Sequence, residues 1–387
     1  MKRVLCLCCA VLFLLFAGTG CSLFDTSLTP AGASEALQSE TDTAPSTETV
    51  QETVTSAGDE NTAEAAQTST TTAATTTDDD DNSPIFSTAN GQTIDKDGTY
   101  TVSGKVSKQI LVTAKKVTLI LDNADVHSSD GSAILGYYEG GKQTLTVQLK
   151  GTSTVTSDSA HGIQGKDNLV ITGSGTVNIT AAKDGLHGGN KLEIAGGNVN
   201  VLGSYEGAEA PEVVISGGKT VIRASDDGIN AASDDRTITP SILQTGGTLT
   251  IYCTSDGVDS NGTFDVTGGT AAIFVGQTRD GDATDREQGS TISVPVLYGF
   301  VNIAKGAKLS VGDWSLTMGE EATRFCLILP GLTEGKSYDI LADGQTIVTT
   351  EATTTLQGMM MGGRGGGPGG GRREGGGPPS PGGFFGW

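Results

Sequence analysis

The chain has 387 residues, a formal net charge of −21 at pH 7 and 57 glycines, but only 10 Phe, 7 Tyr and 2 Trp. Such an acidic surface repels phosphate groups, so we exclude DNA and RNA as partners. Few aromatic residues, with many Gly, Val, Ile and Thr, argue against a helical bundle and predict an all-β fold of short strands and tight turns.

The first 21 residues have the pattern of an export signal. Two basic residues precede an apolar run over residues 4–17, which is too short to span a bilayer, and small residues then lead to Cys21. A Cys in this place resembles the lipobox of bacterial lipoproteins, in which that Cys is lipidated and becomes the mature N-terminus. We therefore expect residues 1–21 to be a lipoprotein-type signal peptide and the protein to be lipid-anchored to the cell membrane, on its extracellular face. An ordinary secretory signal with an incidental Cys is the alternative.

Two other segments are unsuited to forming a core. Residues 22–84 consist mainly of Thr, Ser, Ala and acidic residues, which predicts a disordered stalk, and residues 358–387 are predicted to be a disordered Gly-rich tail. The folded body is expected at residues 85–357. It holds Cys253 and Cys326, which an oxidising exterior would allow to pair. We expect two buried thiols instead, because Cys253 continues an apolar series on one face of a strand.

The body contains an internal repeat. A Gly that follows a polar residue and precedes an apolar one recurs at steps of 23, 22, 21 and 29 residues, at Gly162, Gly185, Gly207, Gly228 and Gly257. Short runs of alternating apolar and polar residues lie between these landmarks and would also suit a β-sandwich. A sandwich does not need the same landmark at the same place in each unit. The sequence therefore predicts a right-handed parallel β-helix of ~22 residues per coil, in which equal positions stack.

This stacking makes further predictions. One inward apolar column should contain Ile163, Leu186, Ala208, Ile229 and Val258. A second glycine landmark in each unit should turn a corner with positive φ. Residues 85–130 and 291–357 have looser spacing and are expected to close the two ends of the solenoid.

Stacking also places acidic residues above one another. The residue before the repeated Gly is a carboxylate in four of five units, and like charges repel at the ~4.8 Å spacing of stacked strands. Carboxylate oxygens from turns, without a Cys or His cluster, suit Ca²⁺. The candidate metal ligands are Asp184, Glu206, Asp226, Asp227, Asp256 and Asp259. The alternative is that these acids are solvated corners that accept backbone N–H groups.

A neighbouring column lies three residues beyond the first. It reads Gln164, His187, Glu209, Asn230 and Asp259. The acidic loop over residues 280–285 is a weaker, separate metal candidate. No nucleophile-elbow, P-loop or zinc-binding motif occurs in the sequence, so no catalytic residue is assigned.

The segment from His161 to Ile171, with the Asp-Gly units after it, resembles the clostridial-type carbohydrate-binding domain family. These are extracellular right-handed β-helices similar in fold to pectate lyases, and the resemblance covers roughly residues 90–290. It implies bound calcium and binding of plant cell-wall polysaccharides, including cellulose and polygalacturonate. Asp184, Asp227 and Asp256 match the family's Asp-Gly acids, whereas Glu206 departs from them.

The leading hypothesis is a monomeric, lipid-anchored, non-catalytic protein that binds an acidic polysaccharide through Ca²⁺. A calcium-dependent polysaccharide lyase is a rival, in which a Lys or Arg would act as the base. Its candidate bases are Lys183, Lys191, Arg223 and Arg279. A structural adhesin with a protein partner is the third hypothesis.

Overall fold

The computed structural model describes residues 85–86, 92–276 and 281–356. The predicted signal peptide, the lipidation site Cys21, the stalk and the Gly-rich tail lie outside these residues. The described residues form strands, turns and loops, without an α-helix. Accordingly, this part of the chain contains no helix that could cross a membrane.

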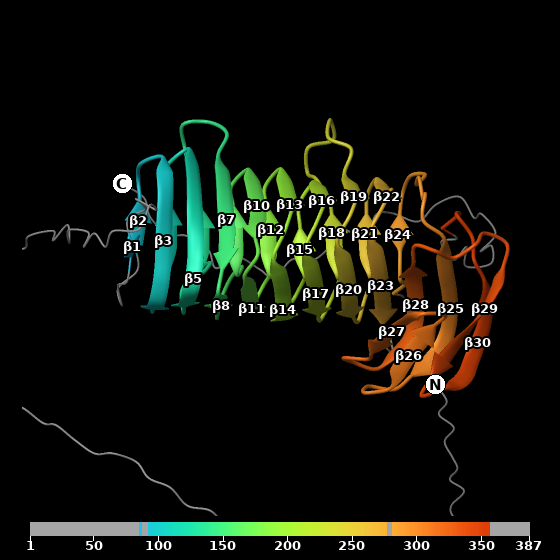
Figure 1. The fold of residues 1–387 in the computed structure, drawn as a ribbon. Coiled ribbons are helices and arrows are strands. Elements are labelled where there is room, and N and C mark those ends of the chain that lie inside the picture. Colours follow the sequence, from blue (N-terminus) through green and yellow to red (C-terminus); the bar gives the residue numbers. More distant parts are fainter. Residues whose placement is uncertain (1–84, 87–91, 277–280, 357–387) are drawn as a thin grey trace, which may run out of the picture. The chain divides into compact units, whose positions relative to one another are not determined.

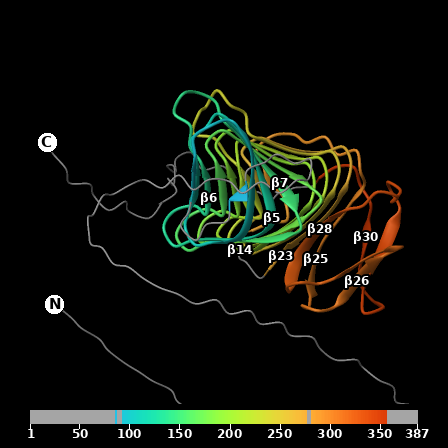
Figure 2. The same cartoon turned by 60° about the vertical axis from the view of Figure 1, so that its left-hand side comes forward.

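Most of the described chain is a stack of coils (Figures 1 and 2). The stack has three faces, each coil adds short strands to them, and the strands within each face are parallel. The first face is a nine-stranded parallel sheet. Its strands, in order, are β2 (Gln92–Ile94), β4 (Ile110–Val112), β6 (Ile134–Gly136), β9 (Ile163–Gly165), β12 (Leu186–Gly188), β15 (Ala208–Glu209), β18 (Ile229–Ala231), β21 (Val258–Ser260) and β24 (Asp285–Arg286).

The other two faces belong to one seventeen-stranded sheet, because the long strand β5 (Lys116–Ser128) pairs with strands of both. One face contains β7 (Thr144–Lys150), β10 (Asn168–Gly173), β13 (Lys191–Ile194), β16 (Glu212–Ile215), β19 (Ser241–Gln244) and β22 (Thr263–Val266). The other contains β8 (Thr152–Ser157), β11 (Thr176–Ala181), β14 (Asn198–Ser204), β17 (Lys219–Ala224), β20 (Thr248–Cys253) and β23 (Thr270–Val275). β1 (Ile85–Phe86) and β3 (Gly98–Val106) pair beside β5 at the N-terminal end.

The core is built from apolar columns that run through the stack. The predicted inward column is confirmed: its five residues pair in register from β9 to β21 and are at most 1% exposed. Burying one such Val, Leu or Ile contributes roughly 1.5–3 kcal/mol. Cys253 and Cys326 are buried free thiols, as expected.

Glycines turn one corner of the coils, again as predicted. The second glycine has positive φ, from 70° to 87°, in four of these corner landmarks: Gly196-Gly197, Gly217-Gly218, Gly246-Gly247 and Gly268-Gly269. In the landmark Gly173-Ser174-Gly175 it is the first glycine that has positive φ, at 95°. An L-residue with a side chain would be strained in this backbone conformation. The step of 29 residues is accommodated by a loop between β18 and β19, which rises from the edge of the stack (Figure 1).

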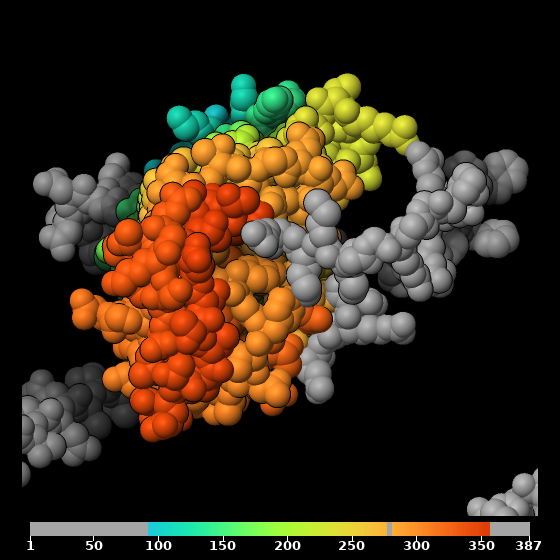
Figure 3. Space-filling view, turned by 90° about the vertical axis from the view of Figure 1, so that its right-hand side faces the viewer, coloured from blue at the N-terminus to red at the C-terminus, as the bar shows by residue number. Residues whose placement is uncertain are grey.

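The C-terminal end is antiparallel. β28 (Ala322–Ile328) pairs antiparallel with β23, and β25 (Val296–Ile303) pairs antiparallel with β28. A separate four-stranded antiparallel sheet follows, made of β26 (Lys308–Val311), β27 (Trp314–Thr317), β29 (Ser337–Ala342) and β30 (Gln345–Glu351). These strands have a second core around Phe274 and Phe325. Figure 3 shows the orange and red residues of this part of the chain at the C-terminal end of the stack. There β28 covers the edge of β23, which would otherwise be exposed.

Candidate functional site

Two columns of polar side chains run along the stack at the first face. The residue before each repeated Gly forms the first column, because each of those Gly N–H groups donates to the carbonyl oxygen of the corresponding residue in the next coil, at 2.8–3.0 Å. The first column is His161, Asp184, Glu206, Asp227, Asp256 and Asp282. The second column pairs in strand register and is Gln164, His187, Glu209, Asn230, Asp259 and Asp285.

The repeated glycines are required by close packing between coils. A Cβ on Gly207 would lie 2.3 Å from the carbonyl oxygen of Gly228 and 2.2 Å from Cγ2 of Ile222. The other repeated glycines meet equivalent atoms, and none has positive φ. The glycine therefore lets the backbone approach closely and fixes the spacing of the side chain before it.

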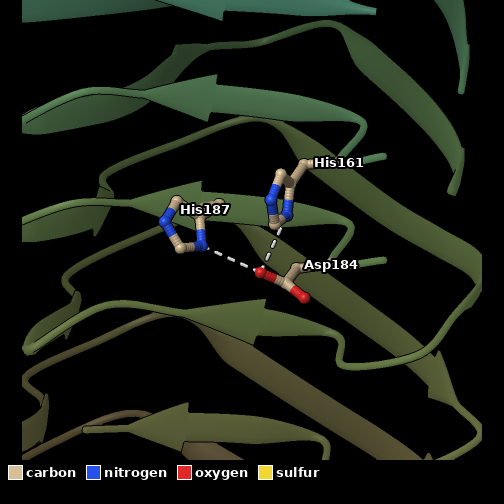
Figure 4. A group of neighbouring side chains, drawn as sticks. All are labelled: His161, Asp184 and His187. Carbon is tan, nitrogen blue, oxygen red and sulfur yellow. Dashed lines mark hydrogen bonds and ion pairs between the residues drawn. The ribbon is translucent and has the colours of Figure 1, made fainter. Parts of the chain in front are cut away.

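At the N-terminal end of the columns, two histidines surround one carboxylate. Asp184 is only 4% exposed, and its Oδ2 lies 2.9 Å from His161 Nδ1 and 2.8 Å from His187 Nδ1 (Figure 4). Burial acts to raise the pKa of Asp184, but the close contacts of its carboxylate with the two histidine rings outweigh burial and hold that pKa well below its usual range.

His187 joins the two columns. Its Nδ1 also lies 3.1 Å from Oε2 of Glu209. Burial acts to lower the pKa of His187, but its contacts with Asp184 and Glu209 outweigh burial and raise the pKa to about 9. Negative charge at this end is therefore balanced by imidazole.

The middle of the columns lacks such balance. Carboxylate oxygens of Glu206, Asp226 and Asp227 lie within 4.8 Å of one another. Glu206 accepts a 3.1 Å hydrogen bond from Asn230 through Oε1, whereas its Oε2 is buried without a hydrogen-bond partner among the described residues. Burial, with repulsion from neighbouring carboxylates including Glu209, raises the pKa of Glu206 to about 8.

The C-terminal end is also rich in carboxylates. Asp227 Oδ1 accepts the backbone N–H of Asp256 at 2.9 Å, and Asp256 Oδ1 accepts that of Asp282 at 2.7 Å. Burial and then neighbouring charges raise the pKa of Asp256 to about 6 and that of Asp259 to about 7. Some of these acids thus do cap backbone N–H groups, yet they remain partly desolvated and close to like charges.

The structure brings the six sequence-predicted ligands into one region. Asp184, Glu206, Asp227 and Asp256 belong to the first column, Asp259 to the second, and Asp226 adjoins Glu206 and Asp227. Five ionisable members of the two columns were not chosen as ligands from the sequence. They are His161, His187, Glu209, Asp282 and Asp285.

Two signals could have identified these residues. The acidic loop at residues 280–285 is not a separate site, because Asp282 and Asp285 continue the columns. The repeat is disguised there because Ala283 occupies the position of the repeated Gly. The second signal is the alignment of the coils. In it His161 occupies the same position as Asp184, one coil earlier, and His187 lies three residues after Asp184.

Two of the candidate bases for a lyase have ordinary acidic partners. Lys191 Nζ lies 3.0 Å from Glu212, and Arg223 Nε lies 3.1 Å from Glu320. Both side chains are thus in ion pairs. Arg279 lies outside the described residues.

The oxygen-rich part of the columns fits a hard cation. It combines a buried carboxylate oxygen without a hydrogen-bond partner with several carboxylates whose pKa is raised. A divalent cation bound by oxygen ligands would neutralise these groups without protonation.

Comparisons with known proteins assign the chain to a family. No curated protein matches the chain. A solved structure of the polysaccharide lyase-like protein from C. thermocellum, a gadolinium derivative, is 24% identical with a TM-score of 0.46, over 52% of this chain and 89% of that one. The model of carbohydrate-binding domain-containing proteins matches residues 88–139 and 140–305, more than half of the sequence. The chain therefore belongs to the family of carbohydrate-binding domain-containing proteins.

Proposed function

We propose that this protein binds an acidic plant cell-wall polysaccharide, such as polygalacturonate, through Ca²⁺ held on the two polar columns. It acts as a non-catalytic, monomeric binding protein of the clostridial type. The coils form a right-handed parallel β-helix, since parallel crossover connections take that hand in about 98% of cases. A lipid on Cys21 and the stalk of residues 22–84 keep it at the extracellular face of the membrane.

The observation that carries the proposal is the group of partly desolvated carboxylates around Glu206. Burial, with repulsion from neighbouring carboxylates, raises the pKa values of Glu206, Asp256 and Asp259 to about 6–8, so these groups take up protons where a cation would satisfy the same oxygens. Glu206, Asp226, Asp227, Asp256 and Asp259 would hold Ca²⁺. The ion supplies positive charge to which a uronate carboxylate can also bind.

An exposed aromatic ring lies beside these ligands. Tyr205 precedes Glu206, is 54% exposed and has its pKa raised to about 12, first by a hydrogen bond to Asp226 and then by that residue's charge. Its ring offers an apolar surface for a sugar while its hydroxyl group is fixed at the acidic column.

The experiment is a pull-down of the full chain on insoluble polygalacturonate and on cellulose, with calcium and with EDTA. We expect retention on polygalacturonate in calcium and release in EDTA. The double variant Glu206→Gln, Asp259→Asn should lose retention. The control Asp125→Asn, Asp313→Asn changes charge equally at two exposed positions away from the columns and should retain it.

Two outcomes would contradict the proposal. Retention that EDTA leaves unchanged removes the role of calcium, and failure to bind either polymer removes polysaccharide binding. Absorbance near 235 nm is read in every supernatant, because an unsaturated product would identify a lyase instead.

A further inference from the structure

The N-terminal end of the columns has a donor set different from the rest. We name His161, Asp184, His187 and Glu209 the histidine cluster. One ligand atom from each of the first three residues lies within 4.8 Å of the other two, and Glu209 Oε2 is 3.1 Å from His187 Nδ1. Two imidazole nitrogens and two carboxylate oxygens therefore converge, from three successive coils.

This chemistry differs from that of a calcium site. Imidazole nitrogen favours transition-metal dications, whereas Ca²⁺ prefers oxygen ligands throughout. Neighbouring ligands around a tetrahedral metal with bonds of about 2.0–2.1 Å lie roughly 3.3 Å apart. The donor atoms lie 2.8–3.1 Å apart in the pairs His161–Asp184, His187–Asp184 and His187–Glu209, so shifts of a few tenths of an ångström in these pairs would admit an ion.

The state of His161 is a second, independent observation. Its side chain is only 13% exposed, and its Nδ1 is buried and makes no hydrogen bond, although it lies 2.9 Å from Asp184 Oδ2. A buried ring nitrogen directed at a carboxylate without such a bond is suited to donating its lone pair to a metal. The ring is also held against His187, with ring centroids 4.5 Å apart, so both imidazoles have a fixed place (Figure 4).

A cleft gives access to the cluster. It has a volume of about 480 Å³ and is lined by His187, Glu209, Asn190 and the inserted loop at Ser233, Asp234 and Asp235. The side chains of His187 and Glu209 are 22% and 30% exposed, so the cluster is partly open to an entering ion. The two loop carboxylates add negative potential at the cleft, which favours a cation.

We propose that the histidine cluster binds one transition-metal dication of the Zn²⁺ class, at a site separate from the calcium ligands in the rest of the columns. The ion supplies positive charge beside Asp184. This site goes beyond the proposed function, although both sites adjoin Asp184.

The experiment measures Zn²⁺ binding to the full, metal-stripped chain in saturating Ca²⁺, by competition with a zinc indicator. We expect one equivalent of zinc. The variants His161→Gln and His187→Gln should each weaken its affinity by roughly 100-fold or more, since even residues that only orient a ligand contribute 10–100-fold. His127→Gln is the matched control, because His127 also contacts a carboxylate, Asp158 at 2.9 Å, but lies outside the cluster.

Two further measurements make the proposal falsifiable if a variant fails to fold. X-ray absorption at the zinc edge of the wild-type protein must show two imidazole ligands, and a shell of oxygen alone would overturn the proposal. The absence of stoichiometric zinc binding in saturating calcium would do the same. Asp259→Asn should keep zinc binding while it weakens calcium-dependent retention, so failure of one site is distinguishable from failure of the other.

Discussion

The two ends of the polar columns share a backbone but differ in how their charge is balanced. At the N-terminal end, two histidines contact Asp184 and hold its pKa well below the usual range, against the effect of burial. Further along, burial and like charges raise the pKa of Glu206 to about 8 and that of Asp259 to about 7. Charge balance is internal at the first end, whereas the second end requires protons or a bound cation.

This difference separates what the repeat fixes from what individual side chains decide. The hydrogen bonds between coils and the close approach at each repeated Gly are the same from one end to the other. The repeat therefore determines where the polar groups stand. The choice of His, Asn, Asp or Glu in each coil determines the charge of the columns at that coil and the kind of ion that can bind there.

The largest expected effect is the loss of stability when a repeated Gly is replaced by Ala, which tests the close packing of the shared backbone. Gly257→Ala would place its Cβ 2.1 Å from Ile273 Cγ2 and 2.6 Å from the carbonyl oxygen of Ala283, and Gly185→Ala meets Val201 and Gly207 at 2.7–2.8 Å. We expect each to lower the free energy of unfolding by about 3 kcal/mol or more, measured by urea denaturation. Gly203→Ala is the control, because nothing lies within 4 Å of its new Cβ. Equal stability of all three variants would refute the packing argument.

Removal of one carboxylate charge should change the free energy of unfolding in opposite directions at the two ends of the columns. Asp184→Asn removes a charge that two histidines stabilise, so it should cost about 1.5–3 kcal/mol at pH 7. Glu206→Gln replaces a carboxylate that burial and repulsion disfavour, so calcium-free protein should gain about 1 kcal/mol after allowance for solvent screening. Denaturant unfolding without calcium measures both. Destabilisation by both variants would show that the two ends are alike.

Much of this site could be predicted from the sequence, because a solenoid converts sequence period into spatial register. The inward apolar column, the corner glycines and the proximity of the six predicted ligands all follow from aligning the units. The columns extend to Asp282 and Asp285, where the alignment was lost because Ala283 stands in place of Gly.

Other features depend on side-chain geometry or on long-range pairing. The contact of His161 and His187 with one oxygen of Asp184 requires rotamers that no spacing specifies. The coils formed by β2 to β6 lack the Gly motif, yet they stack as regularly as the later ones. The antiparallel pairing of β28 with β23 joins residues about 50 positions apart, beyond the reach of local periodicity.

A smaller effect should appear in the pH dependence of calcium-free protein. Glu206, Asp256 and Asp259 have raised pKa values of about 6–8, so the folded state holds more protons than the unfolded state from about pH 4 upward. Their contribution to stability therefore falls as pH rises from about 4 to 8. Thermal unfolding should show a loss of several degrees between pH 5 and pH 6.5, and Ca²⁺ should reverse it.

At the histidine end, the contributions of the ionisable groups to stability are lost in different pH ranges. The lowered pKa of Asp184 contributes stability that is lost only as pH falls below about 4, and the raised pKa of His187 contributes stability that is lost as pH rises from about 6.5 through 9. The interval from pH 5 to pH 6.5 thus reports on the carboxylate end alone. A flat melting temperature there, or a slope that Glu206→Gln with Asp259→Asn leaves unchanged, would contradict the assignment.

The smallest expected effect asks which end contacts the polymer. Tyr205 is 54% exposed beside Glu206 and Asp226, whereas Tyr137 is 48% exposed after β6, on the other side of the histidine cluster. Loss of one aromatic contact of ~0.5–1.5 kcal/mol corresponds to roughly a 2- to 13-fold loss of affinity. Tyr205→Leu should weaken calcium-dependent retention on polygalacturonate by that factor, and Tyr137→Leu should leave it unchanged. If Tyr137→Leu alone weakens retention, the polymer lies on the N-terminal coils, and the carboxylates around Glu206 bind their cation for stability alone.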